Sequence, residues 1–205
     1  MARNRLPKGK IVRRLGINIF GNPKYDRILE KRPYAPGEHG KRRERRLSDY
    51  GLQLKEKQKV KSMYGIMEKQ FRRYFRMAEK SKGITGRVLL QILERRLDNV
   101  VYHSLFAISR SEARQMVSHG HILVNGKKVN IPSYSVDVGD VIKVKEGDNI
   151  VKKIRENQKR LEEKEVPSWL EVDSKKLEVR IKRLPTKEDI PIPIQEQLIV
   201  ELYSK

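Results

Sequence analysis

The stretch SRSEARQMVSHGHILVNGKKVN, residues 109–130, carries side chains whose types and spacing suit phosphate binding. Arg110 and Arg114 are four residues apart, which places them one turn apart on the same face of a helix. A guanidinium can bind two phosphate oxygens at once and keeps its charge. We therefore expect Arg110 and Arg114 to contact a nucleic-acid backbone, together with His119 and Lys127. The alternative is a pair of ordinary surface arginines.

Catalysis and metal binding have little support in the sequence. The chain has no cysteine, which excludes disulfides, thiol catalysis and thiolate zinc sites. The four histidines lack a convincing metal-ligand spacing, since His119 and His121 are two residues apart beside a glycine. The sequence contains no phosphate-binding loop, nucleophile elbow or dinucleotide fingerprint. We expect a protein that is not an enzyme, with no cofactor and no metal.

The elements that position these side chains can be predicted from the same stretch. Ser109 and Glu112 have the S-x-x-E spacing of a capping box, so a helix should start there. Gly120 is suited to end that helix in the left-handed conformation. Asn125-Gly126 favours a type I′ turn, so a hairpin should follow. Two more short strands are expected in the segments SVDV and VIKV.

Positive charge dominates the composition. The chain has 47 Lys and Arg residues against 26 Asp and Glu residues, a formal net charge of +21. Residues 1–80 hold 24 basic and 8 acidic side chains, whereas residues 156–205 hold 10 and 11. No apolar run of about 20 residues could span a membrane. Phosphate backbones are the commonest partner of such an excess, so a nucleic acid should bind mainly before residue 156.

Residues 1–47 are rich in glycine and proline, and we expect a weakly regular, basic N-terminal arm there. The run KRRERR at 41–46 has five cations in six positions, which favours nucleic-acid contact over a merely solvated run. The contacts expected from the rest of the arm are Arg3, Arg5, Arg13 and Arg14.

From Ser48 the pattern becomes helical, with Gly65 marking a kink or a break. Apolar side chains recur at steps of three and four, which we interpret as a buried face and not a base-stacking surface. These are Val60, Met63, Tyr64, Met67, Phe71, Tyr74 and Phe75. The other face should contact nucleic acid through Lys55, Lys57, Lys59, Lys61, Arg72 and Arg73.

The remaining elements follow from shorter patterns. After a linker at 81–85, apolar residues from Leu89 to Val101 predict a second helix. Residues 149–165 predict a helix of mixed charge, and the segments VPSWLEVD and EQLIVELY predict strands. Trp169 is expected to be a packing anchor.

Several of these motifs resemble a known RNA-binding family. LERRLDNVVY, SRSEARQMVSHGHILVNGKKVNI and VGDVIKV are similar to the S-four RNA-binding module. RPYAPGEHG, RLSDYGLQLKEKQKVKSMYGIMEKQF, PSWLEVD and the terminal LIVELYSK extend the resemblance to the bacterial-type small-subunit ribosomal protein S-four family, in its zinc-free, cysteine-less form. The resemblance covers the chain from about Arg3 to Lys205.

The resemblance implies a structural constituent of the small ribosomal subunit that binds small-subunit rRNA. Members of the family nucleate assembly of the 5′ domain as primary binders. They lie near the path along which mRNA enters, beside ribosomal proteins S-three and S-five, and influence translational accuracy with S-five. Aligning on GEHG and RLSDYG places mRNA contacts at Arg42, Arg43 and Arg46, with Arg45 an alternative to Arg43. The location implied is the cytoplasmic ribosome, with an organellar ribosome left open.

The combined prediction is an α+β protein of four segments. These are a basic N-terminal arm (1–47), a helical domain (48–93), an inserted S-four RNA-binding module with a helix pair and a small twisted β-sheet (94–155), and a C-terminal helix and strands that pack back on the helical domain (156–205). The alternatives are an RNA-modifying enzyme that carries the module, for which no catalytic domain remains, a free-standing S-four binding module, and a histone-like DNA binder. A membrane-surface protein is a more distant alternative.

Overall fold

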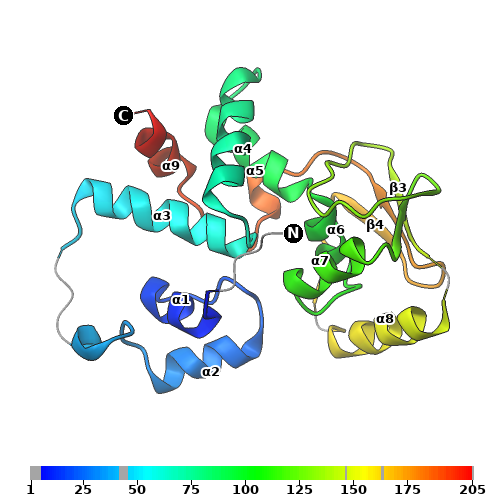
Figure 1. The fold of residues 1–205 in the computed structure, drawn as a ribbon, viewed down its shortest axis with the longest axis horizontal. Helices are drawn as coiled ribbons and strands as arrows, with labels where there is room; N and C mark the ends of the chain where they lie inside the picture. Colours follow the sequence, from blue (N-terminus) through cyan, green and yellow to red (C-terminus); the bar gives the residue numbers. More distant parts are fainter. Residues whose placement is uncertain (1–5, 42–45, 146, 163, 205) are drawn as a thin grey trace. The chain divides into compact units, whose positions relative to one another are not determined.

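The structure is a computed structural model that describes residues 6–41, 46–145, 147–162 and 164–204 (Figure 1). The described residues form two compact units. The first combines the chain up to Gly86 with the chain from Ile192 onward, and the second runs from Arg87 to Pro191. Helices build the first unit and the second adds an antiparallel sheet, which confirms the α+β class. These units cut across the four predicted segments, whose boundaries stay a prediction.

The first unit contains two short helices where a weakly regular arm was expected. Asn22 caps the second of them by accepting a hydrogen bond from the Lys24 N–H at 2.9 Å, and Pro23 occupies its first position. The prediction of weak regularity is therefore wrong for these residues. The helical segments of this unit are α1 (Lys8–Leu15), α2 (Pro23–Lys31), η1 (Glu38–Lys41), α3 (Asp49–Met63), α4 (Glu68–Lys80) and α9 (Glu196–Tyr203).

The predicted break at Gly65 separates α3 from α4. Ser48 caps α3 by accepting a hydrogen bond from the Gly51 N–H at 3.2 Å, and Gly65 has a φ of 62°. Most of the apolar stripe is buried, which confirms the core interpretation. Met67 is the exception, because it precedes α4 as its N-cap and is 46% exposed. The buried members are Val60, Met63, Tyr64, Phe71, Tyr74 and Phe75.

The C-terminal segment EQLIVELY forms helix α9, so the strand predicted there is wrong. α9 packs against α3. The Tyr203 ring stacks on Phe75 with ring centroids 4.5 Å apart, and Gln53 Nε2 donates a hydrogen bond to Glu201 Oε2 at 3.0 Å. A short apolar run favours a strand when it is taken alone, but packing on a neighbouring helix decides the outcome here.

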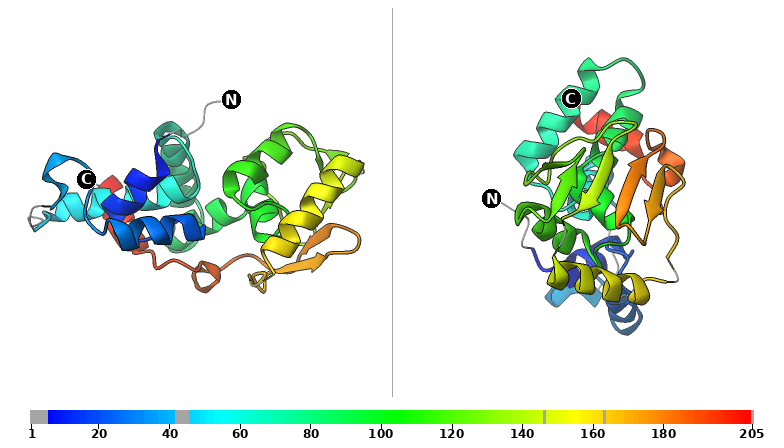
Figure 2. Two further views of the ribbon diagram at one scale, coloured as in Figure 1. Left: turned by 90° about the horizontal axis from the view of Figure 1, so that it is seen from below. Right: turned by 90° about the vertical axis from the view of Figure 1, so that its right-hand side faces the viewer.

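The second unit is built on an antiparallel sheet. Among the described residues the strand order is β2-β1-β3-β5-β4, and the right-hand view of Figure 2 shows these strands side by side. Trp169 and Phe106 are fully buried in its core, which confirms the packing role predicted for Trp169. The strands are β1 (Ile122–Val124), β2 (Lys127–Lys128), β3 (Val141–Val144), β4 (Leu170–Asp173) and β5 (Glu178–Ile181). The helices are α5 (Thr85–Glu94), which begins at the unit boundary, α6 (Leu97–His103), α7 (Arg110–Ser118), α8 (Asp148–Arg160) and η2 (Lys187–Asp189).

Two predictions in this unit need correction. The single helix expected from Leu89 to Val101 is interrupted, because Arg96 has an extended backbone (ψ 135°) between α5 and α6. The segment SVDV is not a strand and makes one isolated bridge, between Ser135 and Arg96. The strands predicted in VIKV and VPSWLEVD and the helix predicted near 149–165 are confirmed as β3, β4 and α8. No helix in the described parts of the chain is long and apolar enough to cross a membrane.

Candidate nucleic-acid interface

Helix α7 carries the two arginines that the sequence singled out. Ser109 Oγ accepts a hydrogen bond from the Glu112 N–H at 3.3 Å, and the Glu112 carboxylate accepts one from the Ile108 N–H at 2.9 Å. This confirms the predicted helix start. The apolar side of α7 is buried in the core. Arg110 and Arg114 lie beside that face.

Arg110 is held by a buried polar chain that begins on α5 and α6. Its Nε donates a hydrogen bond to Asn99 Oδ1 at 2.8 Å, and its guanidinium lies over the Tyr102 ring, 4.5 Å from the centroid. Asn99 is 1% exposed and donates through Nδ2 to Glu94 Oε2 at 2.6 Å. His103 Nε2 lies 3.1 Å from the same carboxylate oxygen. The position of Arg110 is thus fixed by the buried Asn99 and Glu94 and by the half-buried Tyr102 ring.

Arg114 shares a carboxylate with another arginine. Arg96 forms a two-bond pair with Asp98, with Nε–Oδ1 at 3.0 Å and Nη2–Oδ2 at 2.6 Å. Arg114 Nη1 lies 3.8 Å from the same Oδ2. One carboxylate therefore faces two guanidiniums, which places two positive charges close together beside α7.

The spacing of Arg110 and Arg114 predicts a shared helix face, and the structure adds contacts that brace both side chains from outside α7. Arg110 and Arg114 are half-buried and braced by α6. A helical wheel shows neighbours on the same helix only, so the partners on α6 could not be seen from it. Because the side chains are already ordered, binding a phosphate requires less loss of rotamer entropy than it would for a mobile arginine.

The hairpin after α7 presents a further cation. Asn125 and Gly126 have φ values of 49° and 77°, the positive values that a type I′ turn requires, as predicted. Asn125 Nδ2 donates to Asp140 Oδ1 at 2.8 Å, and its Oδ1 accepts a hydrogen bond from the Val141 N–H at 2.9 Å. Lys127 follows this fixed turn and is exposed.

His119 and His121 lie where α7 gives way to β1, with ring centroids 6.1 Å apart. Burial lowers the pKa of His121, and the positive charges of His119, Lys128, Lys145 and Lys153 lower it further. These neighbouring basic side chains, and not the burial, make the potential around His121 positive, which suits a phosphate. Within the described residues, no group of His, Asp and Glu side chains could hold a metal ion.

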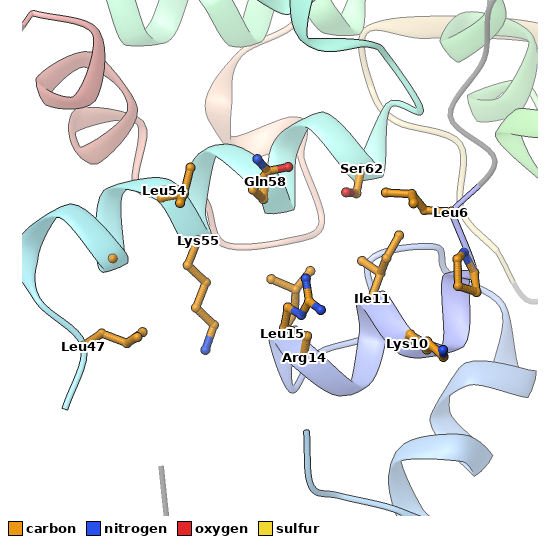
Figure 3. A pocket seen from close by; sticks show the side chains of 12 residues that line it. Leu6, Lys10, Ile11, Arg14, Leu15, Leu47, Leu54, Lys55, Gln58 and Ser62 are labelled. Carbon is orange, nitrogen blue, oxygen red and sulfur yellow. The ribbon is translucent and has the colours of Figure 1, made fainter. Parts of the chain in front are cut away.

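In the first unit the structure brings three predicted residues together. Arg13 Nε donates to Tyr34 O at 3.0 Å and its Nη2 donates to Ala35 O at 3.1 Å. Arg13, Arg14 and Lys55 line one pocket. Figure 3 shows Lys55 extending from α3 toward the end of α1 that carries Arg14. Arg13 and Arg14 are adjacent on α1, whereas Lys55 comes from α3, which is far from α1 in the sequence.

Three of the predicted lysines are instead engaged within the unit. Lys57 and Lys61 bind the two oxygens of Glu68 at 2.9 and 3.0 Å, and Lys59 lies 2.7 Å from Glu56. Burial alone would raise the pKa of Glu68, but hydrogen bonds from both lysines and a tyrosine outweigh it and lower that pKa to about 2. These lysines therefore face acidic partners, a placement that differs from the uniformly phosphate-facing surface expected from the sequence.

The remaining predicted contacts form two groups, those that are exposed in the structure and those that the structure does not describe. The exposed ones are Arg14, Arg46, Arg72, Arg73, His119 and Lys127. Those that lie outside the described residues are Arg3, Arg5, Arg42 and Arg43.

Sequence reasoning missed the residues that hold the arginines. Asp98 has no role in the predicted interface, but in the structure it is buried in an ion pair with Arg96. Asn99 received no role. The sequence does contain a sign of their role. Asp98 and Asn99 lie between the apolar residues Leu97 and Val100 of a predicted buried helix, and a polar side chain buried there needs a hydrogen-bond partner.

The chain is similar to known ribosomal proteins. The family model described as "Ribosomal protein S4/S9 N-terminal domain" matches residues 3–94, and the model "S4 domain" matches residues 95–142. The chain is 55% identical over 203 residues to the small ribosomal subunit protein uS4 of Caldicellulosiruptor saccharolyticus, covering 97% of each chain. It is 52% identical to uS4 of Syntrophus aciditrophicus, covering all of both chains. It is 50% identical to uS4 of Borreliella burgdorferi, covering all of this chain and 99% of the relative.

Proposed function

The chain belongs to the uS4 family of small ribosomal subunit proteins, and from this premise we propose that it is a structural, non-catalytic component of the small ribosomal subunit that binds small-subunit rRNA. Its place is the ribosome of the cytoplasm. The observation that carries the proposal is the pair of braced arginines, Arg110 and Arg114, within the segment that matches the S4 domain.

Recognition rests on phosphate positions and RNA shape. Arginines held in place by α6 act as fixed points for phosphate oxygens, and Lys127 adds a point on the hairpin. The major groove of A-form RNA is too narrow for side chains to read, so a rigid set of cations recognises the spacing of the backbone.

The chain binds the 5′ domain of the rRNA early, as a primary binder that nucleates its assembly. Support comes from the bracing of Arg110, which uses only residues of this chain, Asn99 and Glu94 among them. These contacts orient the arginine within the chain before RNA arrives.

The arginines of the basic run at 41–46 serve a different ligand in this proposal. They face mRNA on the path along which mRNA enters, and the chain lies beside ribosomal proteins S-three and S-five, influencing accuracy with the latter. Support comes from the motifs GEHG and RLSDYG on either side of the run, and from the exposure of Arg46. The residues concerned are Arg42, Arg43 and Arg46.

The test is a double variant with a matched control. Arg110→Ala with Arg114→Ala should weaken binding to an rRNA 5′-domain transcript and reduce the dependence of log K on log salt by about two. Arg155→Ala with Arg160→Ala removes the same charge from exposed positions of α8. Equal effects of the two double variants would contradict the assignment of the interface to α7.

A further inference from the structure

Two pockets of the first unit meet at a shared rim. One has a volume of about 310 Å³ and the other about 720 Å³. Arg14, Leu15 and Lys55 line both of them. Ligand sites for small molecules commonly span roughly 300 to 1,000 Å³. The two pockets differ in chemistry, so a ligand that filled both would need a charged part and an apolar part.

The smaller pocket is cationic. Its lining includes Arg13, Arg14, Lys41 and Lys55, and no carboxylate belongs to the described residues around it. The Tyr34 ring lies under two of these cations, with its centroid 4.9 Å from the Arg13 guanidinium and 5.5 Å from Lys41 Nζ. An anion placed here meets several cations, as a phosphate site requires.

Backbone geometry builds one wall of the cationic pocket. Gly40 packs so closely on the preceding loop that a Cβ at this position would lie 1.8 Å from Ala35 O. Ala35 O also accepts the hydrogen bond from Arg13 Nη2. The close approach therefore brings Lys41 and Arg13 to the same pocket, and it does so only with glycine at position 40.

The larger pocket is mainly apolar. Figure 3 shows side chains of α1 and of α3 lining it, with Ile11 and Leu15 on α1 and Leu54 on α3. Leu6 and Leu47 also line it and are 61% and 43% exposed. Apolar side chains that meet in a hollow favour a ligand that covers them.

Two polar groups lie within this apolar lining. Gln58 and Ser62 are on α3 one turn apart and both line the larger pocket. Neither side chain has a hydrogen-bond partner within the described parts of the chain. An amide offers both a donor and an acceptor, which matches the edge of a nucleobase.

We propose that the two pockets together bind one unstacked nucleotide of RNA. Its phosphate lies among Arg13, Arg14, Lys41 and Lys55, and its base enters the apolar pocket toward Gln58. This inference rests on the proposed function, because it names a subsite of the same RNA ligand. An apolar protein segment would use the larger pocket but would leave the cations beside it unmatched, whereas a nucleotide carries a phosphate and a base in one ligand and can use both adjoining pockets.

Nuclear magnetic resonance titration of the full chain provides the first test. Adenosine 5′-monophosphate should shift the amide signals around both pockets and bind more tightly than inorganic phosphate or adenosine alone. Lys41→Ala should weaken this binding, whereas Lys24→Ala, which removes an exposed cation outside both pockets, should not. Leu54→Ala should weaken binding of the nucleotide but not of phosphate, and Leu52→Ala on the same helix serves as its control.

The second test uses the rRNA 5′-domain transcript. A base contact contributes roughly 1 kcal/mol or more, so Lys41→Ala combined with Leu54→Ala should raise Kd about tenfold. Lys24→Ala with Leu52→Ala should change Kd less than about twofold. If the wild-type chain binds the transcript but the two double variants match, the nucleotide site is refuted while the proposed function stands. If the free nucleotide binds and the transcript is insensitive, the ligand is a small nucleotide and the inference about RNA is wrong. If the wild type does not bind the transcript, the proposed function fails first.

Discussion

Replacing Asn99 by alanine would show whether the arginines of α7 work because they are held in place. Asn99 is 1% exposed, and its amide joins Arg110 Nε at 2.8 Å to Glu94 Oε2 at 2.6 Å. The substitution removes no charge from the protein. It takes away the acceptor that orients Arg110 and the donor that satisfies a buried carboxylate. RNA binding and stability should therefore change by different amounts.

The magnitudes follow from these contacts. Losing hydrogen bonds to buried charged groups should lower the free energy of unfolding by about 2–3 kcal/mol. Arg110 would keep its contact with Tyr102, at 4.5 Å from the ring centroid, but would have to be ordered on binding. Ordering one such side chain costs about 0.5–1.5 kcal/mol, which is roughly a 2- to 12-fold rise in Kd for RNA.

The assay is binding to the rRNA 5′-domain transcript, measured well below the melting temperature at several salt concentrations. Asn157→Ala is the matched control, because Asn157 is 3% exposed and donates to Phe106 O at 3.0 Å, with no bond to Arg110 or Arg114. Both variants should be destabilised. Only Asn99→Ala should lose affinity, and its salt slope should stay that of the wild type, since no cation is removed.

Two results would refute this reasoning. Equal losses of affinity in Asn99→Ala and Asn157→Ala would mean that general destabilisation explains the effect. Unchanged affinity in a destabilised Asn99→Ala variant would mean that the orientation of Arg110 does not matter for RNA. A double-mutant cycle with Arg110→Ala adds a check, because the two changes should be far from additive if they act through one contact.

Three further changes test other parts of the molecule. Combining Arg42→Ala, Arg43→Ala and Arg46→Ala should leave rRNA affinity nearly unchanged but slow translation of messages with stable hairpins. A large loss of rRNA affinity in this triple variant would assign these arginines to rRNA. Glu68 has its pKa lowered to about 2 in the folded chain, so its stabilising effect is complete above the unfolded value of about 4.3 and is lost as pH falls toward 2. The stability difference between wild type and Glu68→Gln in urea should therefore be constant near neutral pH and shrink in acid, and a difference independent of pH would contradict the ion pair. Gly65→Ala should lower the free energy of unfolding by about 1 kcal/mol, because a φ of 62° is unfavourable for a residue with a side chain. The added methyl group has open space around it, so no steric clash contributes. Unchanged unfolding in urea would contradict this backbone strain.

Helix starts and turns that depend on residues adjacent in the sequence could be predicted. The start of α7 depends on Ser109 and Glu112, and the hairpin depends on Asn125-Gly126, so a few adjacent side chains specify each. The helical state of 196–203 depends on packing against α3, which no local pattern records. The extended Arg96 between α5 and α6 likewise bonds to a segment almost forty residues later, at Ser135.

The site was predictable in residue type more than in arrangement. Lys61 and Glu68 are seven residues apart in the sequence. If both were on one straight helix, they would be separated by about 10 Å along its axis. The break at Gly65 instead brings Lys61 within 3.0 Å of Glu68, so a cation expected at the surface is paired. The partners of Arg110 and Arg114 also come from another helix, which only the fold reveals.

The central claim is that a fixed set of cations recognises folded ribosomal RNA. The most direct measurement compares the affinity of the chain for an rRNA 5′-domain transcript with its affinity for duplex DNA of equal length across a salt series. A strong preference for the transcript that persists at physiological salt is the predicted result, because shape recognition survives screening. Equal affinities that fall together as salt rises would show a generic polycation and contradict the claim.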